Sequence, residues 1–229
     1  MYSLAAIVPF YNEERFLEES VTKLIETNLF DEVILVDDNS TDKSSYIGKK
    51  IEKKYQMVKY YKKNTNEGKG SAVIFGYSKT SCSHIIVHDA DLEYDPNDIV
   101  SLKALSRKNP ESLILGSRTI GNIMRSKQYN HLVIGNRFIT YVFSKINKIS
   151  ISDISTCYML YPKIFIDSAE INEKKFGIEI EILSKFLKTG NKIIETPINY
   201  SGRSYLEGKK ITYKDGIGIF LKVFKYKFL

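Results

Sequence analysis

Residues 83–96 read SHIIVHDADLEYDP, where an apolar run typical of a buried strand leads directly into four carboxylates, Asp89, Asp91, Glu93 and Asp95. Like charges this close together repel each other, so either water solvates them or a cation belongs among them. Two aspartates at alternate positions after a strand can bind a hard divalent ion through oxygen, with substrate phosphates completing its shell. The alternative is a solvated acidic loop before the next helix. Asp95 fits a helix cap in either case.

An ion bound at this position would be Mg²⁺ or Mn²⁺, because the predicted ligands are oxygen atoms and zinc would recruit histidine or cysteine. His88 is the only nearby nitrogen ligand, and it lies on the predicted strand. The two cysteines, Cys82 and Cys157, have unrelated surroundings in the sequence, which indicates neither a disulfide framework nor a metal knuckle. Reduced cysteines fit a cytoplasmic location.

The same alternation of apolar strand and polar turn extends over the first 116 residues. It predicts strands at 3–10, 32–36, 57–61, 84–88 and 112–117, and amphipathic helices at 13–28, 40–55, 68–79 and 95–108. We expect the second of these helices to be capped by Ser40 or Thr41. Apolar strands that alternate with helices predict an α/β fold with a mostly parallel sheet covered on both faces.

The second half of the chain is less regular. Residues 130–147 and 176–190 have helical spacing, whereas 153–161 and 192–200 are strand-like, the last interrupted by Pro197. No repeat or linker is evident, so a single domain over residues 1–229 is the simplest organisation.

Polar motifs follow four of the predicted strands, at the edge where parallel sheets bind their ligands. They are PFYNEE, DDNSTD, HDADLE and GSR, at residues 9–14, 37–42, 88–93 and 116–118. Neither a dinucleotide GxGxxG fingerprint nor a P-loop is present, which disfavours NAD and P-loop chemistry. No apolar stretch reaches the ~18 residues of a spanning helix, and no secretory signal is evident.

The net charge of +7 favours anionic partners such as anionic lipid or phosphorylated small molecules. The lysines are dispersed and no recognition motif appears, so we do not expect nucleic acid to be a partner.

Taken together, these motifs with NEGKGSA at 66–72 resemble the family 2 glycosyltransferases, which have the GT-A fold. DISTCYMLY, FGIEIEI and ETPINYSGRSYLEGKKITYKDGI in the second half resemble the branch of dolichol-phosphate mannose synthases and related polyprenyl-phosphate glycosyltransferases. The resemblance covers nearly the whole chain. It implies a nucleotide-sugar-binding half at residues 1–118 and an acceptor-side half at 119–229.

The resemblance also implies roles for individual residues. Asp38 would contact the base or ribose, and Asp89 and Asp91 would be the Asp-x-Asp metal pair, with Asp91 favoured as the direct ligand and Glu93 as a further one. Lys69 is a weaker candidate for the donor site and reads equally well as a solvated lysine at a helix start. The remaining candidates are Pro9, Tyr11 and Glu13 in the nucleotide pocket and Arg118 and Arg203 on the phosphates.

The implied activity is an inverting, metal-dependent transfer of sugar from a UDP- or GDP-sugar to a polyprenyl phosphate. A lipid phosphate is already an anion near neutral pH and needs little help from a base. The alternatives are transfer to a sugar hydroxyl, which would need a base, and an inactive relative that only binds nucleotide sugar. Candidate bases are Asp153, Glu179 and Glu181. Ser155 departs from a position where relatives often carry glutamate, which puts the acceptor in doubt.

Residues 216–229, GIGIFLKVFKYKFL, interleave aromatic and aliphatic side chains with lysines. Such a segment can lie in a membrane interface, aided here by Lys209 and Lys210, or it can pack on the core with its lysines outward. The first possibility predicts a cytoplasmic protein that is peripheral on the cytoplasmic face of the membrane.

Overall fold

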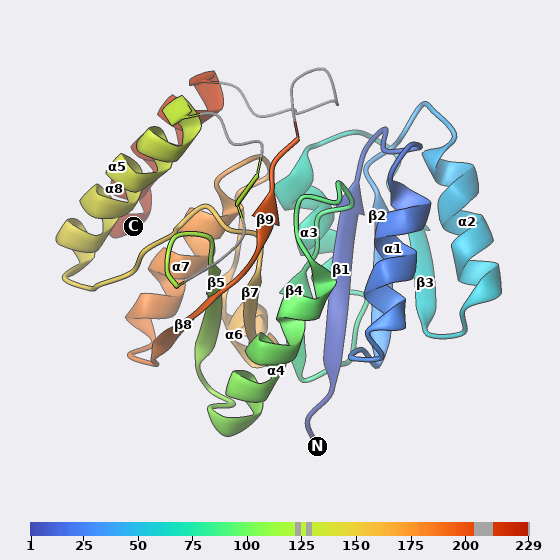
Figure 1. The fold of residues 1–229 in the computed structure, drawn as a ribbon, viewed down its shortest axis with the longest axis horizontal. Helices are drawn as coiled ribbons and strands as arrows, with labels where there is room; N and C mark the ends of the chain where they lie inside the picture. The colour runs from blue at the N-terminus through green and yellow to red at the C-terminus, as the bar shows by residue number, and fades with distance from the viewer. Residues whose placement is uncertain (122–124, 127–129, 204–212, 229) are drawn as a thin grey trace.

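The computed structural model of the chain describes residues 1–121, 125–126, 130–203 and 213–228. A seven-stranded sheet runs through its centre in the order β3-β2-β1-β4-β7-β5-β8 (Figure 1). A separate ladder pairs the short strands β6 and β9. The strands are β1 Leu4–Phe10, β2 Glu32–Asp37, β3 Val58–Lys62, β4 His84–Val87, β5 Leu113–Ser117, β6 Arg125–Ser126, β7 Met159–Pro162, β8 Ile193–Pro197 and β9 Tyr200–Ser201.

The two halves of the chain share this sheet. Strands β3, β2, β1 and β4 are parallel neighbours, as the alternating sequence predicts. The antiparallel strand β7, from the second half, lies between β4 and β5, and β8 pairs in parallel with β5. The predicted mostly parallel sheet is therefore confirmed, with strands of the second half inside it and at its edge.

Helices cover both faces of the sheet (Figure 1). Side chains alternate along β1, so that Ile7 packs in one apolar cluster with α3, α5, α7 and α8, whereas Leu4, Ala6 and Val8 pack in another with α1 and α4. Burial on both faces explains why this strand is a continuous apolar run. The helices are α1 Leu17–Glu26, α2 Ser44–Lys54, α3 Lys69–Tyr77, α4 Ile99–Lys108, α5 Asn130–Asn147, α6 Lys163–Ala169, α7 Ile178–Lys188 and α8 Tyr213–Phe228.

The predicted cap of α2 is wrong, because the helix begins at Ser44. The Ser40 hydroxyl instead accepts a hydrogen bond from the Asn12 backbone N–H at 3.0 Å, and Thr41 contacts the Asn12 side chain at 3.2 Å. These hydroxyls connect the loop after β2 to the loop after β1. Both loops lie at the edge of the sheet where its parallel strands end.

The predicted strand at 153–161 is only partly present, because β7 begins at Met159. In the segment before β7, Asp153 is fully buried, and its carboxylate accepts hydrogen bonds from the Arg118 and Asn136 side chains. By contrast, Asp95 caps the turn before α4 as predicted, since its carboxylate accepts the Asn97 N–H at 2.9 Å. In the part of the chain described here, no helix has the length and apolar character needed to cross a membrane.

Candidate active site

A cavity of about 770 Å³ opens at the carboxyl ends of the parallel strands. It brings together residues that are far apart in the sequence, from the end of β1 to helix α8. Eleven of the predicted site residues line it, namely Pro9, Tyr11, Glu13, Asp38, Lys69, Asp89, Asp91, Glu93, Arg118, Glu179 and Arg203. Asp153 and Glu181 are the exceptions, because both are buried outside the cavity lining.

Arg203 is surrounded by carboxylates at the floor of this cavity. Its guanidinium lies 3.1 Å from the Glu13 carboxylate and 3.3 Å from that of Asp91. The Glu93 carboxylate accepts the Arg203 backbone N–H at 2.7 Å and the Tyr200 hydroxyl. One cation therefore connects three of the acidic side chains that the sequence singled out.

The surroundings of Asp91 disfavour the ionised form of its carboxyl group. Burial, together with repulsion from Asp89 and Glu93, raises its pKa to about 7, although Arg203 acts in the opposite direction. Burial and the two neighbouring carboxylates therefore outweigh the effect of Arg203 on this carboxyl group. A divalent cation at this point would favour its ionised form.

Lys69, at the first turn of α3, bridges two carboxylates across the cavity. Its ammonium lies 2.9 Å from Asp89 and 3.1 Å from Glu179. Burial alone would lower the pKa of Lys69, but these two carboxylates outweigh it and hold the pKa well above its ordinary value. The lysine is therefore an ion-paired part of the cavity wall rather than a solvated residue at a helix start.

Glu179 and Glu181 have different surroundings, although only one residue separates them on α7. Glu179 lines the cavity. Glu181 is 1% exposed and accepts the backbone N–H groups of Asn172 and Glu173, at 3.0 and 2.7 Å. Of these two candidate bases, Glu179 faces the space where a ligand could bind.

Asp38 holds the loop between β3 and α3 in place. One of its oxygens lies 2.8 Å from the Lys63 ammonium, and the other accepts the Gly68 backbone N–H at 2.7 Å. Gly68 has a φ of +102°, and a Cβ built on it would come within 2.8 Å of the Lys174 carbonyl oxygen. This packing fixes the loop that leads into Lys69.

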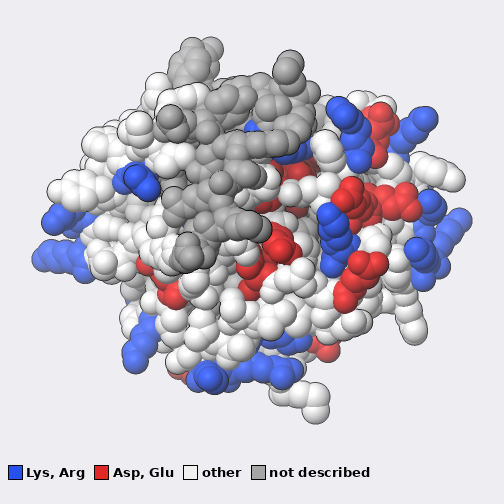
Figure 2. Space-filling view, viewed as in Figure 1, with Lys and Arg blue, Asp and Glu red and all other residues white. Residues whose placement is uncertain are grey.

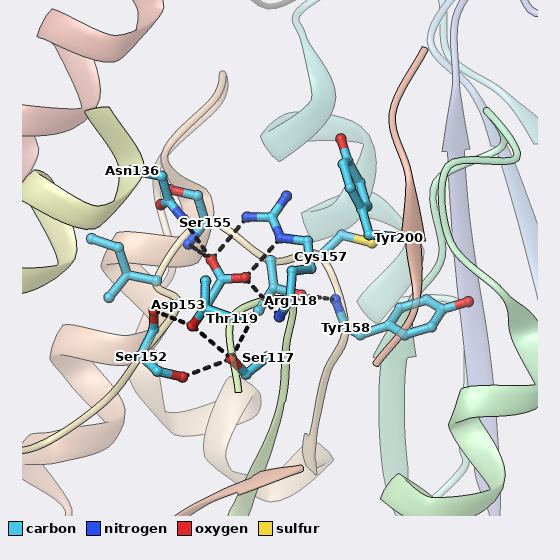
Figure 3. A network of polar contacts seen from close by, with 12 residues as sticks. Ser117, Arg118, Thr119, Asn136, Ser152, Asp153, Ser155, Cys157, Tyr158 and Tyr200 are labelled. Atoms are coloured by element: carbon cyan, nitrogen blue, oxygen red, sulfur yellow. Dashed lines mark hydrogen bonds and ion pairs between the residues drawn. The ribbon is translucent and has the colours of Figure 1, made fainter. Parts of the chain in front are cut away.

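Arg118 and Asp153 form a buried ion pair in the cavity wall (Figure 3). The Arg118 guanidinium donates from Nε at 2.7 Å and from Nη2 at 2.8 Å, and Asn136 donates to the same carboxylate at 2.9 Å. Burial would raise the pKa of Asp153, but the contacts with Arg118 prevail and hold the pKa below its usual value. A base at Asp153 would have to give up this pairing.

The far wall of the cavity is apolar. Side chains of α5 and α8 form it, including Phe138, Ile139 and Phe220, and the Phe138 and Phe220 rings stack at 5.9 Å. The cavity therefore has a charged end at the strand termini and an apolar end between these two helices.

Tyr200 and Asn136 are two of the polar lining residues that were not predicted from the sequence. The Tyr200 ring lies 5.0 Å from the Arg118 guanidinium, and the residue pairs with Tyr94 across an isolated bridge. Asn136 lies on α5 directly before Arg137, and no signal in the sequence alone separates these two polar residues. The predicted Lys209 and Lys210 lie outside the described residues.

The donor atoms fit a hard divalent ion only in part. Across the described ranges, no three side chains among histidine, cysteine, aspartate and glutamate are placed to hold a metal by themselves. Asp89 and Asp91 supply carboxylate oxygens on one loop, and magnesium commonly uses one or two carboxylates with substrate phosphates. The protein thus provides part of such a shell.

Solved structures with the same fold bind nucleotides. Glucosyl-3-phosphoglycerate synthase from Mycobacterium tuberculosis in complex with UDP matches with a TM-score of 0.75 and 14% identity, covering 100% of this chain and 81% of that one. S. aureus TarS in complex with UDP-GlcNAc matches with a TM-score of 0.64 and 16% identity, covering 98% and 66%. The predicted GT-A fold is confirmed by this similarity.

Sequence relatives cover most of the chain. A dolichol-phosphate mannosyltransferase of Pyrococcus furiosus is 29% identical over 91% of this chain, which spans 60% of that protein's length. One of the same name from Mycosarcoma maydis is 27% identical over 90% of this chain and 74% of its own length. The sequence profile of glycosyl transferase family 2 matches residues 5–168, and the chain belongs to that family.

Proposed function

We propose that this chain is an inverting, metal-dependent transferase that moves a sugar from a UDP- or GDP-sugar to a polyprenyl phosphate. The observation that carries the proposal is the two-ended cavity, whose charged floor continues into an apolar wall between α5 and α8. A lipid phosphate has the same two-ended character. Two relatives are named dolichol-phosphate mannosyltransferases, which agrees with such an acceptor.

The charged end suits the diphosphate of the donor. Asp89 and Asp91 would hold Mg²⁺ or Mn²⁺, and a bound ion would supply neutralisation of the leaving diphosphate. A relative in fold is described in complex with Mn²⁺ and UDP. Arg203 and Arg118 add guanidinium groups, which bind phosphate oxygens in a fixed two-pronged geometry.

The acceptor phosphate acts as the nucleophile. One of its oxygens forms a bond to the anomeric carbon while the bond from that carbon to the diphosphate oxygen breaks. Attack from the side opposite the leaving group inverts the anomeric configuration. No proton has to be removed from a phosphate that is already ionised, so the ion pairing of Asp153 with Arg118 is compatible with this chemistry.

The outer surface of α5 and α8 suits contact with a lipid interface. The two helices lie side by side in Figure 1, and the corresponding left side of Figure 2 is mostly white with scattered Lys and Arg groups, whereas charges of both signs crowd the right side. Lys225 and Lys227 are exposed next to this surface, whereas Lys222 is ion-paired with Glu173 at 3.0 Å. The exposed apolar residues are Ile134, Phe138, Tyr141, Ile217, Leu221, Phe224 and Phe228.

A transfer assay on liposomes tests the proposal. Vesicles of anionic lipid with polyprenyl phosphate would be mixed with Mn²⁺ and radiolabelled UDP-glucose, UDP-N-acetylglucosamine or GDP-mannose. We expect label in the lipid phase with one of these donors and none after metal chelation. The double variant Leu221→Gln/Phe224→Gln should lower both vesicle binding and transfer. Ile164→Gln is the matched control, because Ile164 is 77% exposed on α6, outside this surface.

Two outcomes would contradict the proposal. Transfer that persists after complete chelation would remove the metal from the reaction. Label that enters only free saccharide acceptors, with the protein absent from floated vesicles at low salt, would favour a sugar hydroxyl as the acceptor instead.

A further inference from the structure

Glu179 is the one acidic side chain that the second half of the chain contributes to the described cavity lining. Its side chain is 15% exposed, and no catalytic step proposed above uses it. It lies at the border between the charged floor and the apolar wall, where Lys69 on one side links it to Asp89.

Glu179 is held in a fixed orientation. One carboxylate oxygen lies 3.1 Å from the Lys69 ammonium, and the other accepts the Gly177 backbone N–H at 3.3 Å. The residue also lies in the first turn of α7, where the helix dipole favours a negative charge. Each carboxylate oxygen has two lone pairs, so both can accept a further hydrogen bond from a ligand.

The charge of this side chain limits what it can recognise. An ionised carboxylate only accepts hydrogen bonds, and it repels phosphate groups of a donor or an acceptor. Its partner in the cavity must therefore present hydroxyl or amide donors. In a nucleotide sugar the group that follows the diphosphate is the sugar, and Glu179 is one lysine bridge away from Asp89, which is proposed to hold the metal ion that neutralises the diphosphate.

We infer that Glu179 accepts hydrogen bonds from hydroxyl groups of the donor sugar and thereby helps to determine which sugar is transferred. This inference rests on the proposed function, since it requires a nucleotide sugar in the cavity. Lys69 then acts as a positioning residue, because it fixes the distance between the sugar-binding carboxylate and Asp89.

The test compares the affinities of the nucleotide diphosphate and of the nucleotide sugar. Isothermal titration in Mn²⁺ would use UDP with UDP-glucose and UDP-N-acetylglucosamine, and GDP with GDP-mannose, on wild type and Glu179→Gln. We expect the variant to lose about tenfold or more in affinity for the preferred nucleotide sugar, the effect of one hydrogen bond to a charged group. Affinity for the diphosphate alone should stay within about twofold, because it has no sugar to contact.

Controls separate this role from a purely structural one. If Glu179 were only the counterion of Lys69, the variant would weaken diphosphate and nucleotide sugar equally, and this result would overturn the inference. Glu111→Gln, an exposed glutamate outside the cavity lining, should change neither affinity. Thermal melting of each variant checks that the fold is retained.

The remaining outcomes also discriminate. An unchanged ratio of affinities in a folded Glu179→Gln protein that still binds the diphosphate overturns the inference and leaves the proposed function standing. Wild-type protein that binds none of the nucleotides overturns both.

Discussion

Replacing Asp153 by asparagine should destabilise the protein strongly. The substitution keeps the size of the side chain but deprives the Arg118 guanidinium of its charged bidentate partner at 2.7 and 2.8 Å, and the Arg118 side chain is only 16% exposed. Removing one partner of a buried ion pair typically costs about 3–5 kcal/mol, because the other charge stays buried and unpaired. For a chain of this size that loss corresponds to a fall in melting temperature of roughly 6–20 °C.

The measurement is urea unfolding at pH 7, followed by circular dichroism and compared with a matched surface pair. Asp167→Asn removes the partner of Lys163 at 2.6 Å, but Asp167 is 56% exposed, so the loss should stay below about 1 kcal/mol. The double variant Arg118→Met/Asp153→Leu should recover part of the stability that the single variant loses, since it leaves no buried charge, although the Asn136 amide and the Arg118 backbone N–H lose their acceptor.

Activity distinguishes the ion pair from a catalytic role. Although part of its stability returns, the double variant should be inactive in sugar transfer, because it lacks the Arg118 guanidinium that is proposed to bind phosphate. If Asp153→Asn unfolds within about 1 kcal/mol of wild type and still loses transfer, the pairing argument fails. Asp153 would then have to act in the chemistry itself, as a sugar-hydroxyl acceptor would require.

Two further substitutions test the site and the sheet. Arg203→Lys keeps the charge but loses the two-pronged contact with Glu13 and Asp91, so we expect about a tenfold lower turnover with a smaller change in donor affinity; wild-type turnover would exclude the phosphate role. Burial lowers the pKa of His84 below its ordinary value of 6.5, so the folded state binds fewer protons than the unfolded state and stability falls as the pH drops below 6.5. His84→Gln should reduce this slope by at most about 1.4 kcal/mol per pH unit in urea titrations between pH 7.5 and 5, while buried His88, whose pKa is lowered to about 4, keeps its own contribution; an unchanged slope would rule out a contribution from His84.

The first half of the fold was predictable because its signals are local. Strands that are buried on both faces are continuous apolar runs, and polar residues follow them where the chain reaches the ligand-binding edge. The order of the second half depends on contacts that have no local signal. Met159 begins an antiparallel strand between β4 and β5, and only the packing of the whole sheet decides that position.

In the candidate site too, some residues were predictable from local sequence and others depended on tertiary packing. Asp89, Asp91 and Arg118 follow strands, so topology alone places them at one edge of the sheet. Glu179 and Glu181 could not be distinguished by sequence, because residues two apart on a helix lie on nearly opposite sides, and tertiary packing decides which side meets the cavity.

The charged end and the apolar end of the cavity are formed by different parts of the chain. Strands β1, β2 and β4 bring carboxylates to one edge, whereas α5 and α8 bring apolar side chains, and no single stretch of the chain contains both. Two ion pairs connect the halves of the chain. Arg203 of the second half pairs with Asp91 of the first, and Glu179 of the second half pairs with Lys69 of the first. A change in the second half can therefore alter the sugar or the acceptor while the strand-end carboxylates stay in place.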